Sequence, residues 1–152
     1  MNKRLFAIAF GALIVAPVAG HMALGASGSP PTAAPGSYPD WWRDVTVLAV
    51  APDGTWGVGT DKIFDSAVAR ALADCKRKYR REIGCGYQQT AVRAGWSVMF
   101  RCGGENIIAS ERRLADAIQQ ARRQEIQIRM HYQPDMSRCE RIVTVDPRGS
   151  VV

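Results

Sequence analysis

Histidine is nearly absent from this chain. Only two histidines, His21 and His131, occur among 152 residues, and the four cysteines form no Cys-x-x-Cys pair. Zinc sites and thioredoxin-like redox sites are built from these residues at short spacing, so the sequence argues against both. The Gly-x-Ser-x-Gly, His-Glu-x-x-His and Gly-x-x-x-x-Gly-Lys patterns are absent as well. We therefore expect no metal, no cofactor and no catalysis that rests on a known motif.

Two carboxylates leave one catalytic alternative open. Asp53 and Glu105 occupy equivalent positions in two predicted turns, so a hydrolase with paired carboxylates is conceivable. The other interpretation is that both are ordinary turn residues at the surface. His131 lies at the end of a predicted helix and is interpreted as a solvated or capping residue, while His21 falls in a segment that we expect to be removed. The expectation is a protein that is not an enzyme.

The first 25 residues have the pattern of a secretory signal peptide. Two basic residues precede an apolar run at residues 5–18, and small residues follow at 23–26. The run is short for a membrane-spanning helix, although an uncleaved anchor is the alternative. No cysteine precedes Cys75, which argues against a lipoprotein anchor. We expect an exported protein, periplasmic or secreted, with no transmembrane anchor after cleavage.

The chain after the signal divides into a tether, one domain and a tail. Residues 26–40 are rich in proline, glycine and serine and predict a flexible tether. Residues 41–146 have the length of a single domain, and 147–152 form a tail. The pair Trp41 and Trp42 at the domain start is expected to dock onto the core rather than to bind a ligand.

The domain is organised around residues 45–82. Residues 45–51 are apolar on both alternating faces, which predicts a strand buried on both sides. The turn residues 52–54 and a second short strand at 55–60 follow. Apolar residues at three- and four-residue steps then predict a helix that starts near Thr60 or Asp61 and ends before Gly84.

A weaker copy of this unit begins at residue 96. Residues 96–102 predict a strand with one core face and one solvent face. The core face has Trp96, Val98, Phe100 and Cys102, and the solvent face has Ser97, Met99 and Arg101. A second helix is expected from Ser110, its N-cap, to about His131. Cysteine-led strands at 85–92 and 139–145 follow the two helices, and residues 93–95 predict a hairpin between the strands 85–92 and 96–102.

These elements predict an α+β fold. The expected architecture is an antiparallel sheet of about six strands with two helices packed on it. The order strand-strand-helix-strand occurs twice, which indicates either an internal ββαβ duplication or a repeated supersecondary arrangement.

Four cysteines in an exported chain indicate two disulfides, for which three connectivities exist. Cys75 lies near the end of the first helix and Cys85 begins the next strand, so we favour Cys75–Cys85 and, by elimination, Cys102–Cys139. Each bridge contributes about 2–4 kcal/mol to the stability of a small domain.

Part of the chain resembles a known family. The run Ala-Pro-Asp-Gly-Thr-Trp-Gly-Val-Gly at 51–59, the helical Ala-Leu-Ala-Asp-Cys at 71–75 and Gly84-Cys85 are similar to the small secreted bacterial domain of unknown function 4189. The resemblance covers residues 41–102. It implies an exported α+β domain with a helix-to-strand disulfide and no established activity. The second helical unit and the long basic helix end depart from the family pattern.

Basic residues are in excess. Without the predicted signal, 18 basic and 14 acidic residues remain, a net charge of about +4. The charge gathers at residues 76–81 and along the second helix. One interpretation is that these cations are solvated surface residues that also stabilise the negative C-terminal end of a helix. The other is that they form a binding site for an acidic protein or an anionic envelope surface. We do not expect nucleic acid as a partner. The candidate partner-binding residues are Arg77, Arg80, Arg81, Arg112, Arg113, Arg122, Arg123 and Trp56.

The sequence therefore favours an exported, non-enzymatic binding protein of the bacterial envelope, of the inhibitor or immunity type, acting on a protein partner. Arginine and tryptophan are the side chains that most often anchor such interfaces. A cationic module that binds the cell envelope or a host surface is the first alternative. The carboxylate hydrolase is the second.

Overall fold

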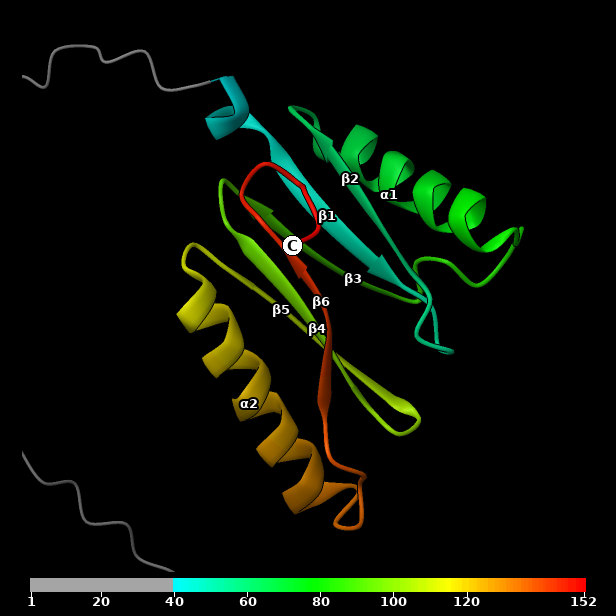
Figure 1. Ribbon diagram of the computed structural model, residues 1–152, viewed down its shortest axis with the longest axis vertical. Coiled ribbons are helices and arrows are strands. Elements are labelled where there is room, and N and C mark those ends of the chain that lie inside the picture. Colours follow the sequence, from blue (N-terminus) through cyan, green and yellow to red (C-terminus); the bar gives the residue numbers. More distant parts are fainter. Residues whose placement is uncertain (1–39) are drawn as a thin grey trace, which may run out of the picture. The chain divides into compact units, whose positions relative to one another are not determined.

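The computed structural model describes residues 40–152. Its elements are η1 (Asp40–Arg43), β1 (Val45–Val50), β2 (Trp56–Asp61), α1 (Phe64–Tyr79), β3 (Gln88–Arg93), β4 (Trp96–Cys102), β5 (Glu105–Glu111), α2 (Leu114–His131) and β6 (Glu140–Val145) (Figure 1). The predicted signal peptide at 1–25 and, except for Asp40, the predicted tether at 26–40 lie outside the described residues. Residues 40–152 belong to one compact unit.

The six strands form two antiparallel sheets in place of the single sheet that we expected. The first has the order β2-β1-β3 and the second the order β5-β4-β6. Each sheet and its helix therefore make one ββαβ unit with the same topology. Val47 pairs with Gly59 in the first hairpin, and Val98 pairs with Ala109 at the matching place in the second. The α+β class, the six strands and the two helices are confirmed.

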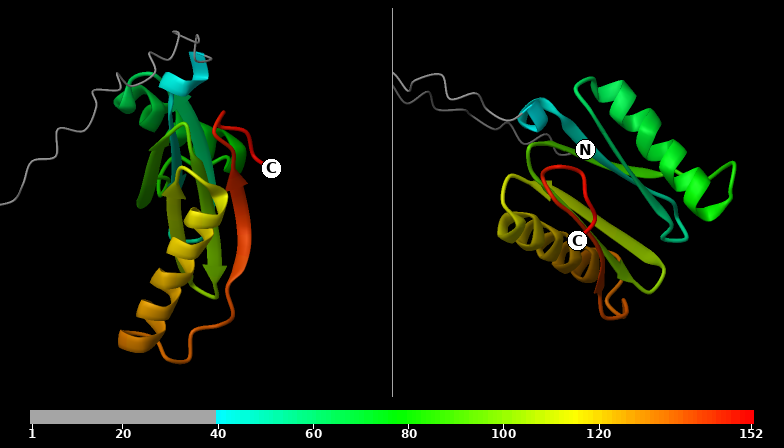
Figure 2. Two further views of the ribbon diagram at one scale, coloured as in Figure 1. Left: turned by 90° about the vertical axis from the view of Figure 1, so that its left-hand side faces the viewer. Right: turned by 45° about the horizontal axis from the view of Figure 1, so that its top comes forward.

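The two sheets face each other and the helices cover their outer faces (Figures 1 and 2). Leu48 and Val50 of β1 meet Met99 of β4 and Val143 and Val145 of β6 in an apolar layer between the sheets. A second cluster joins β1 to α1, and a third joins β4 and β5 to α2. Because β1 has a helix on one face and a sheet on the other, all six of its residues are buried, as its apolar pattern predicts.

Two predictions are wrong because the strands form two sheets that pack face to face. Ser97 and Met99 share a face of β4, as predicted, but both are fully buried against the first sheet instead of facing solvent, whereas Arg101 of the same face is half-buried. The hydroxyl of Ser97 is satisfied there by Ser110, at 2.6 Å between the two Oγ atoms. The segment 93–95 connects β3 to β4 across the two sheets and is not a hairpin turn, because β3 pairs only with β1.

The helices begin and end at other residues than expected. Thr60 and Asp61 belong to β2, and Ser110 belongs to β5, so none of the three is the N-cap. Ile63 and Arg113 hold those positions without a side-chain cap. The first helix ends at Tyr79, four residues before the predicted end, because Arg80 adopts the left-handed conformation (φ 51°) that closes it.

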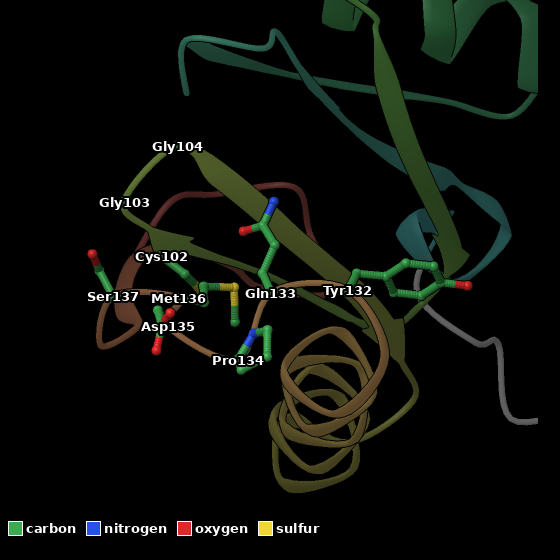
Figure 3. A pocket seen from close by; sticks show the side chains of 9 residues that line it. All are labelled: Cys102, Gly103, Gly104, Tyr132, Gln133, Pro134, Asp135, Met136 and Ser137. Atoms are coloured by element: carbon green, nitrogen blue, oxygen red, sulfur yellow. The ribbon is translucent and has the colours of Figure 1, made fainter.

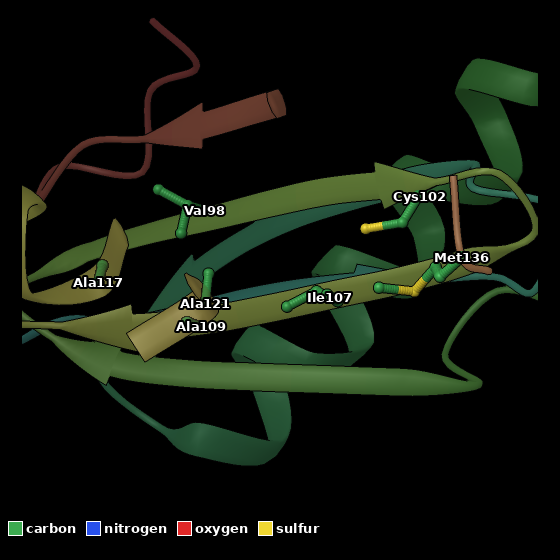
Figure 4. Packing of buried hydrophobic residues seen from close by; sticks show 7 residues of the cluster. All are labelled: Val98, Cys102, Ile107, Ala109, Ala117, Ala121 and Met136. Atoms are coloured by element: carbon green, nitrogen blue, oxygen red, sulfur yellow. The ribbon is translucent and has the colours of Figure 1, made fainter. Parts of the chain in front are cut away.

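Helix α1 lies unusually close to β2. A Cβ atom on Gly57 would stand 2.2 Å from the carbonyl oxygen of Ala71, and one on Gly59 would stand 2.2 Å from that of Ala67. Because the strand has glycines and the helix has alanines at this contact, the two backbones approach each other directly. In the second unit Ile107 and Ala109 face α2 instead, and Val98, Met136 and the alanines of α2 complete that cluster (Figure 4).

Polar contacts tie the two hairpin turns together. Asn106 of β5 is 8% exposed and its Nδ2 donates to the carbonyl oxygens of Ala51 (2.9 Å) and Pro52 (3.3 Å). Arg101 of β4 donates to Asn106 Oδ1 at 2.6 Å and to the Pro52 carbonyl at 2.9 Å. These bonds join the first ββαβ unit to the second, since Ala51 and Pro52 follow β1.

The two ends of the described chain contact each other, and the C-terminal end also pairs with β6. The guanidinium of Arg148 lies 5.7 Å from the centre of the Trp41 ring, and Trp42 packs edge-on against Trp41. Val151 forms a β-bridge with Val145, so the predicted tail folds back along β6. Within residues 40–152, no helix combines the length and the apolar character that crossing a membrane requires.

Both predicted disulfides are present. Cys75 of α1 is bonded to Cys85, and Cys102 at the end of β4 is bonded to Cys139 just before β6. Cys85 does not begin a strand, because β3 starts only at Gln88. The first bridge therefore closes the loop after α1, and the second holds the segment after α2 against the second hairpin.

Candidate functional site

The structure divides the seven candidate arginines between the two outer helices. Arg77, Arg80 and Arg81 lie at the end of α1 and just beyond it. The others precede α2 or lie on it: Arg112, Arg113, Arg122 and Arg123. Because α1 and α2 cover the outer faces of different sheets, the two groups do not form one patch (Figure 2). A cationic binding site therefore involves the arginines of one helix and not those of both.

Three of these arginines already have acidic partners. Arg81 Nη1 lies 2.7 Å from Asp53 Oδ2 and 2.5 Å from the hydroxyl of Thr55, which fastens the loop after α1 to the β1–β2 turn. Arg77 pairs with Asp74 at 2.7 Å, and Arg113 pairs with Asp116 at 2.7 Å. Exposed ion pairs such as Arg77–Asp74 and Arg113–Asp116 contribute at most about 1 kcal/mol to the stability of the fold. Arg81 is therefore a structural residue and not a free cation.

The other four arginines are exposed: Arg80, Arg112, Arg122 and Arg123. Within residues 40–152 their side chains make no hydrogen bond or ion pair. Lys76, on the last turn of α1, is likewise exposed and has no acidic partner among these residues. Such cations are available to an external anion without the loss of an internal contact.

Trp56 is not an exposed anchor. It is half-buried at the start of β2 and packs against the layer between the sheets. The Lys78 ammonium covers its ring at 2.8 Å from the centroid. Burial lowers the pKa of Lys78 from its usual 10.5, and burial likewise raises the pKa of the neighbouring Tyr79 phenol. Trp56 and Lys78 thus close the edge of the core, and Trp56 is less suited to a partner than the sequence indicated.

The loop after α1 is held in one conformation by several contacts. The Cys75–Cys85 bridge closes it, and Arg81 Nη1 bonds to Asp53. Gly86 has a φ of +92° and lies so close to Leu72 that a Cβ atom would stand 2.5 Å from Leu72 Cδ2. The glycine is therefore required for its backbone conformation.

Two large apolar side chains project from this constrained loop. Ile83 is 82% exposed and Tyr87 is 71% exposed. Neither was predicted to be exposed, because the sequence pattern indicates a strand at Tyr87 and the end of the helix at Ile83. The available signal for Ile83 was the predicted Cys75–Cys85 bridge, since the chain must turn back after the helix for the two cysteines to meet; Tyr87 lies beyond the bridge.

Asp53 and Glu105 have separate partners. Hydrogen bonds from the hydroxyl and the backbone N–H of Thr55, together with Arg81, lower the pKa of Asp53 to about 2. Such a carboxyl stays ionised and does not serve as a general acid near neutral pH. Glu105 Oε1 instead accepts a hydrogen bond from Gln133 at 2.9 Å. His131 is exposed at the end of α2, edge-on to Tyr132. The geometry gives the hydrolase alternative no support.

A cavity of about 440 Å³ lies beside the second disulfide (Figure 3). It is formed by the β4–β5 turn and by the segment after α2, and Arg129 holds that segment by donating to the carbonyl oxygens of Met136 and Ser137. Its described lining has one carboxylate, Asp135, and no histidine. Within residues 40–152, no group of three or more histidine, cysteine, aspartate or glutamate side chains is placed to hold a metal ion.

Comparison of the chain with protein-family models, with curated proteins and with solved structures finds no match. The resemblance to the domain of unknown function 4189 therefore stays a prediction. The class that the structure defines is a disulfide-stapled α+β domain of two ββαβ units with cationic outer helices.

Proposed function

We propose that this protein is an exported, non-enzymatic binding protein that acts on an acidic protein partner, as an inhibitor or an immunity protein does. The observation that carries the proposal is the cationic end of α1. Five basic and two acidic residues lie between Asp74 and Tyr87, on a helix end and a loop closed by a disulfide. Lys76 and Arg80 have no acidic partner in the described part of the chain.

The two disulfides support the exported location. Structural disulfides persist in oxidising compartments and are rare where thiols are kept reduced. The predicted signal peptide at residues 1–25 agrees with this, and the same argument favours the periplasm or the extracellular space.

The test is an affinity capture with the oxidised protein at two salt concentrations. Envelope and culture fractions of the source bacterium and its neighbours supply the candidates. We expect one acidic protein to remain bound at high salt, because a packed interface is less sensitive to screening than a diffuse charge attraction.

Matched charge reversals locate the site. The double variants Lys76→Glu with Arg80→Glu and Arg122→Glu with Arg123→Glu change the net charge equally, but on different helices. The first pair should weaken capture at least tenfold, and the second should leave it within twofold. Equal losses from both pairs would mean that only the overall charge matters.

Helix α2 favours a second candidate, a module that binds an anionic envelope surface. Arg122 and Arg123 are exposed on this helix, and so are Ile126 (53%) and Met130 (68%). Cations beside apolar side chains on one helix suit a membrane interface. Sedimentation with vesicles containing phosphatidylglycerol tests it, because salt-labile binding that is lost in the Arg122→Glu and Arg123→Glu double variant would support this candidate.

A further inference from the structure

The loop between α1 and β3 (Figure 1) exposes two large apolar side chains. Ile83 and Tyr87 are four positions apart, and both are more exposed than Ile126 of α2 at 53%. Single exposed apolar residues are ordinary on a protein surface. Two of them on one short loop, close in sequence to the unpaired Arg80, have the composition of protein interfaces, where tyrosine and arginine are enriched.

The loop presents these side chains from a constrained backbone. The Cys75–Cys85 bridge and the Arg81–Asp53 ion pair each fix one point of it. Gln89 Nε2 donates to the Gly86 carbonyl next to Tyr87. A loop that is already ordered loses less conformational entropy when it binds, so more of the contact energy appears as affinity.

The charges around the loop favour a protein partner over an anionic bilayer. Lys76 and Arg80 offer unpaired positive charge, which an acidic rim would complement. Glu82 is exposed directly beside Ile83, so insertion of Ile83 into an anionic bilayer would bring a carboxylate against the lipid phosphates. A protein can instead place a donor opposite Glu82 while it receives the neighbouring apolar side chain.

We propose that Ile83 and Tyr87 are the apolar anchors of this protein, and that they enter an apolar pocket rimmed by carboxylates on a partner protein. The inference rests on the proposed function and specifies its surface. Lys76 and Arg80 pair with the rim. The disulfide fixes the backbone at Cys85, which lies between the two anchors.

Photocrosslinking tests this surface directly. A benzophenone side chain introduced at position 83 should form an adduct with one acidic protein, the same protein that the wild-type chain captures. The matched control carries the benzophenone at position 126 on α2, where no adduct with that protein is expected. Ile126 is an apolar and exposed position, so the control differs only in location.

Substitutions provide the quantitative readout. Ile83→Asp and Tyr87→Ala should each reduce capture of the crosslinked protein at least tenfold, and Ile126→Asp should change it less than twofold. Because these side chains are mostly exposed, all three variants should unfold at the denaturant concentration of the wild type.

The outcomes separate this inference from the proposed function. If a protein is captured but crosslinks only from position 126, or if Ile83→Asp binds it as the wild type does, the surface is wrong and the proposed function stands. If the benzophenone at position 83 forms an adduct with lipid alone, the proposal of a protein partner is wrong. If the wild-type chain retains no protein at all, the proposed function fails and this inference with it.

Discussion

Gly57 of β2 lies directly against the backbone of α1 at Ala71. A Cβ atom on this glycine would stand 2.2 Å from the Ala71 carbonyl oxygen and 2.4 Å from the Cys75 nitrogen. Both obstacles belong to the helix backbone and cannot rotate away. The closeness of helix and strand in the first unit thus depends on a missing side chain.

Gly57→Ala should destabilise the protein by about 3 kcal/mol or more, because α1 must shift away from its sheet to admit the methyl group. Denaturant unfolding measures this as a lower midpoint. Gly104→Ala is the matched control, since nothing lies within 4 Å of a Cβ atom there. An equal effect of both substitutions would contradict the close contact.

Asn106→Ala should cost about 1–3 kcal/mol of stability, because the Ala51 carbonyl and the Arg101 guanidinium lose a buried partner. The loss should appear in the free energy of unfolding from denaturant titration. Gln133→Ala is the control, since it also removes an amide but from an exposed bond to Glu105. A loss no greater than that of the control would mean that the two turns are not joined through Asn106.

Asp53 should make stability depend on pH in the acid range. Its pKa is about 2 in the folded protein against an ordinary 3.8. Since the folded pKa is the lower one, the stabilisation is present above pH 3.8 and is lost as the pH falls through about 2. The difference in unfolding free energy between wild type and Asp53→Asn should therefore shrink between pH 4 and pH 2.

Thr55→Val provides the control for this pH dependence. The Thr55 hydroxyl is the largest cause of the lowered Asp53 pKa, so its removal should raise that pKa toward 3.8. A carboxyl titration followed by NMR measures the change. An unchanged Asp53 pKa would show that the Thr55 hydroxyl does not set it.

The two disulfides should contribute unequally. Cys75–Cys85 spans ten positions and Cys102–Cys139 spans 37. In the chain-entropy model the longer loop loses more freedom, so replacing Cys102 and Cys139 by alanine should cost about 1 kcal/mol more than replacing the other pair. Chemical unfolding of the two double variants measures the difference. A larger loss from the shorter loop would show that strain or packing outweighs loop entropy.

The candidate site was only partly predictable. Basic clusters are visible in the sequence, and the structure shows Arg80, Arg112, Arg122 and Arg123 as exposed. Arg81 was not recognisable as a structural residue, because its partner Asp53 is 28 positions away. Ile83 and Tyr87 were missed, because exposure depends on where the neighbouring segments fold.

Local structure and the covalent framework could be predicted from residue patterns alone. Periodicity located the helices and most of the strands, and the position of Cys75 near Cys85 indicated the first bridge and, by elimination, the second. The division of the six strands into two sheets depends on contacts that form only on folding. The alternation in β4 shows that Ser97 and Met99 share a face, but the layer that covers this face comes from β1 of the other sheet. Local propensity acts between near neighbours, whereas burial and free charge are decided by segments that meet only after folding.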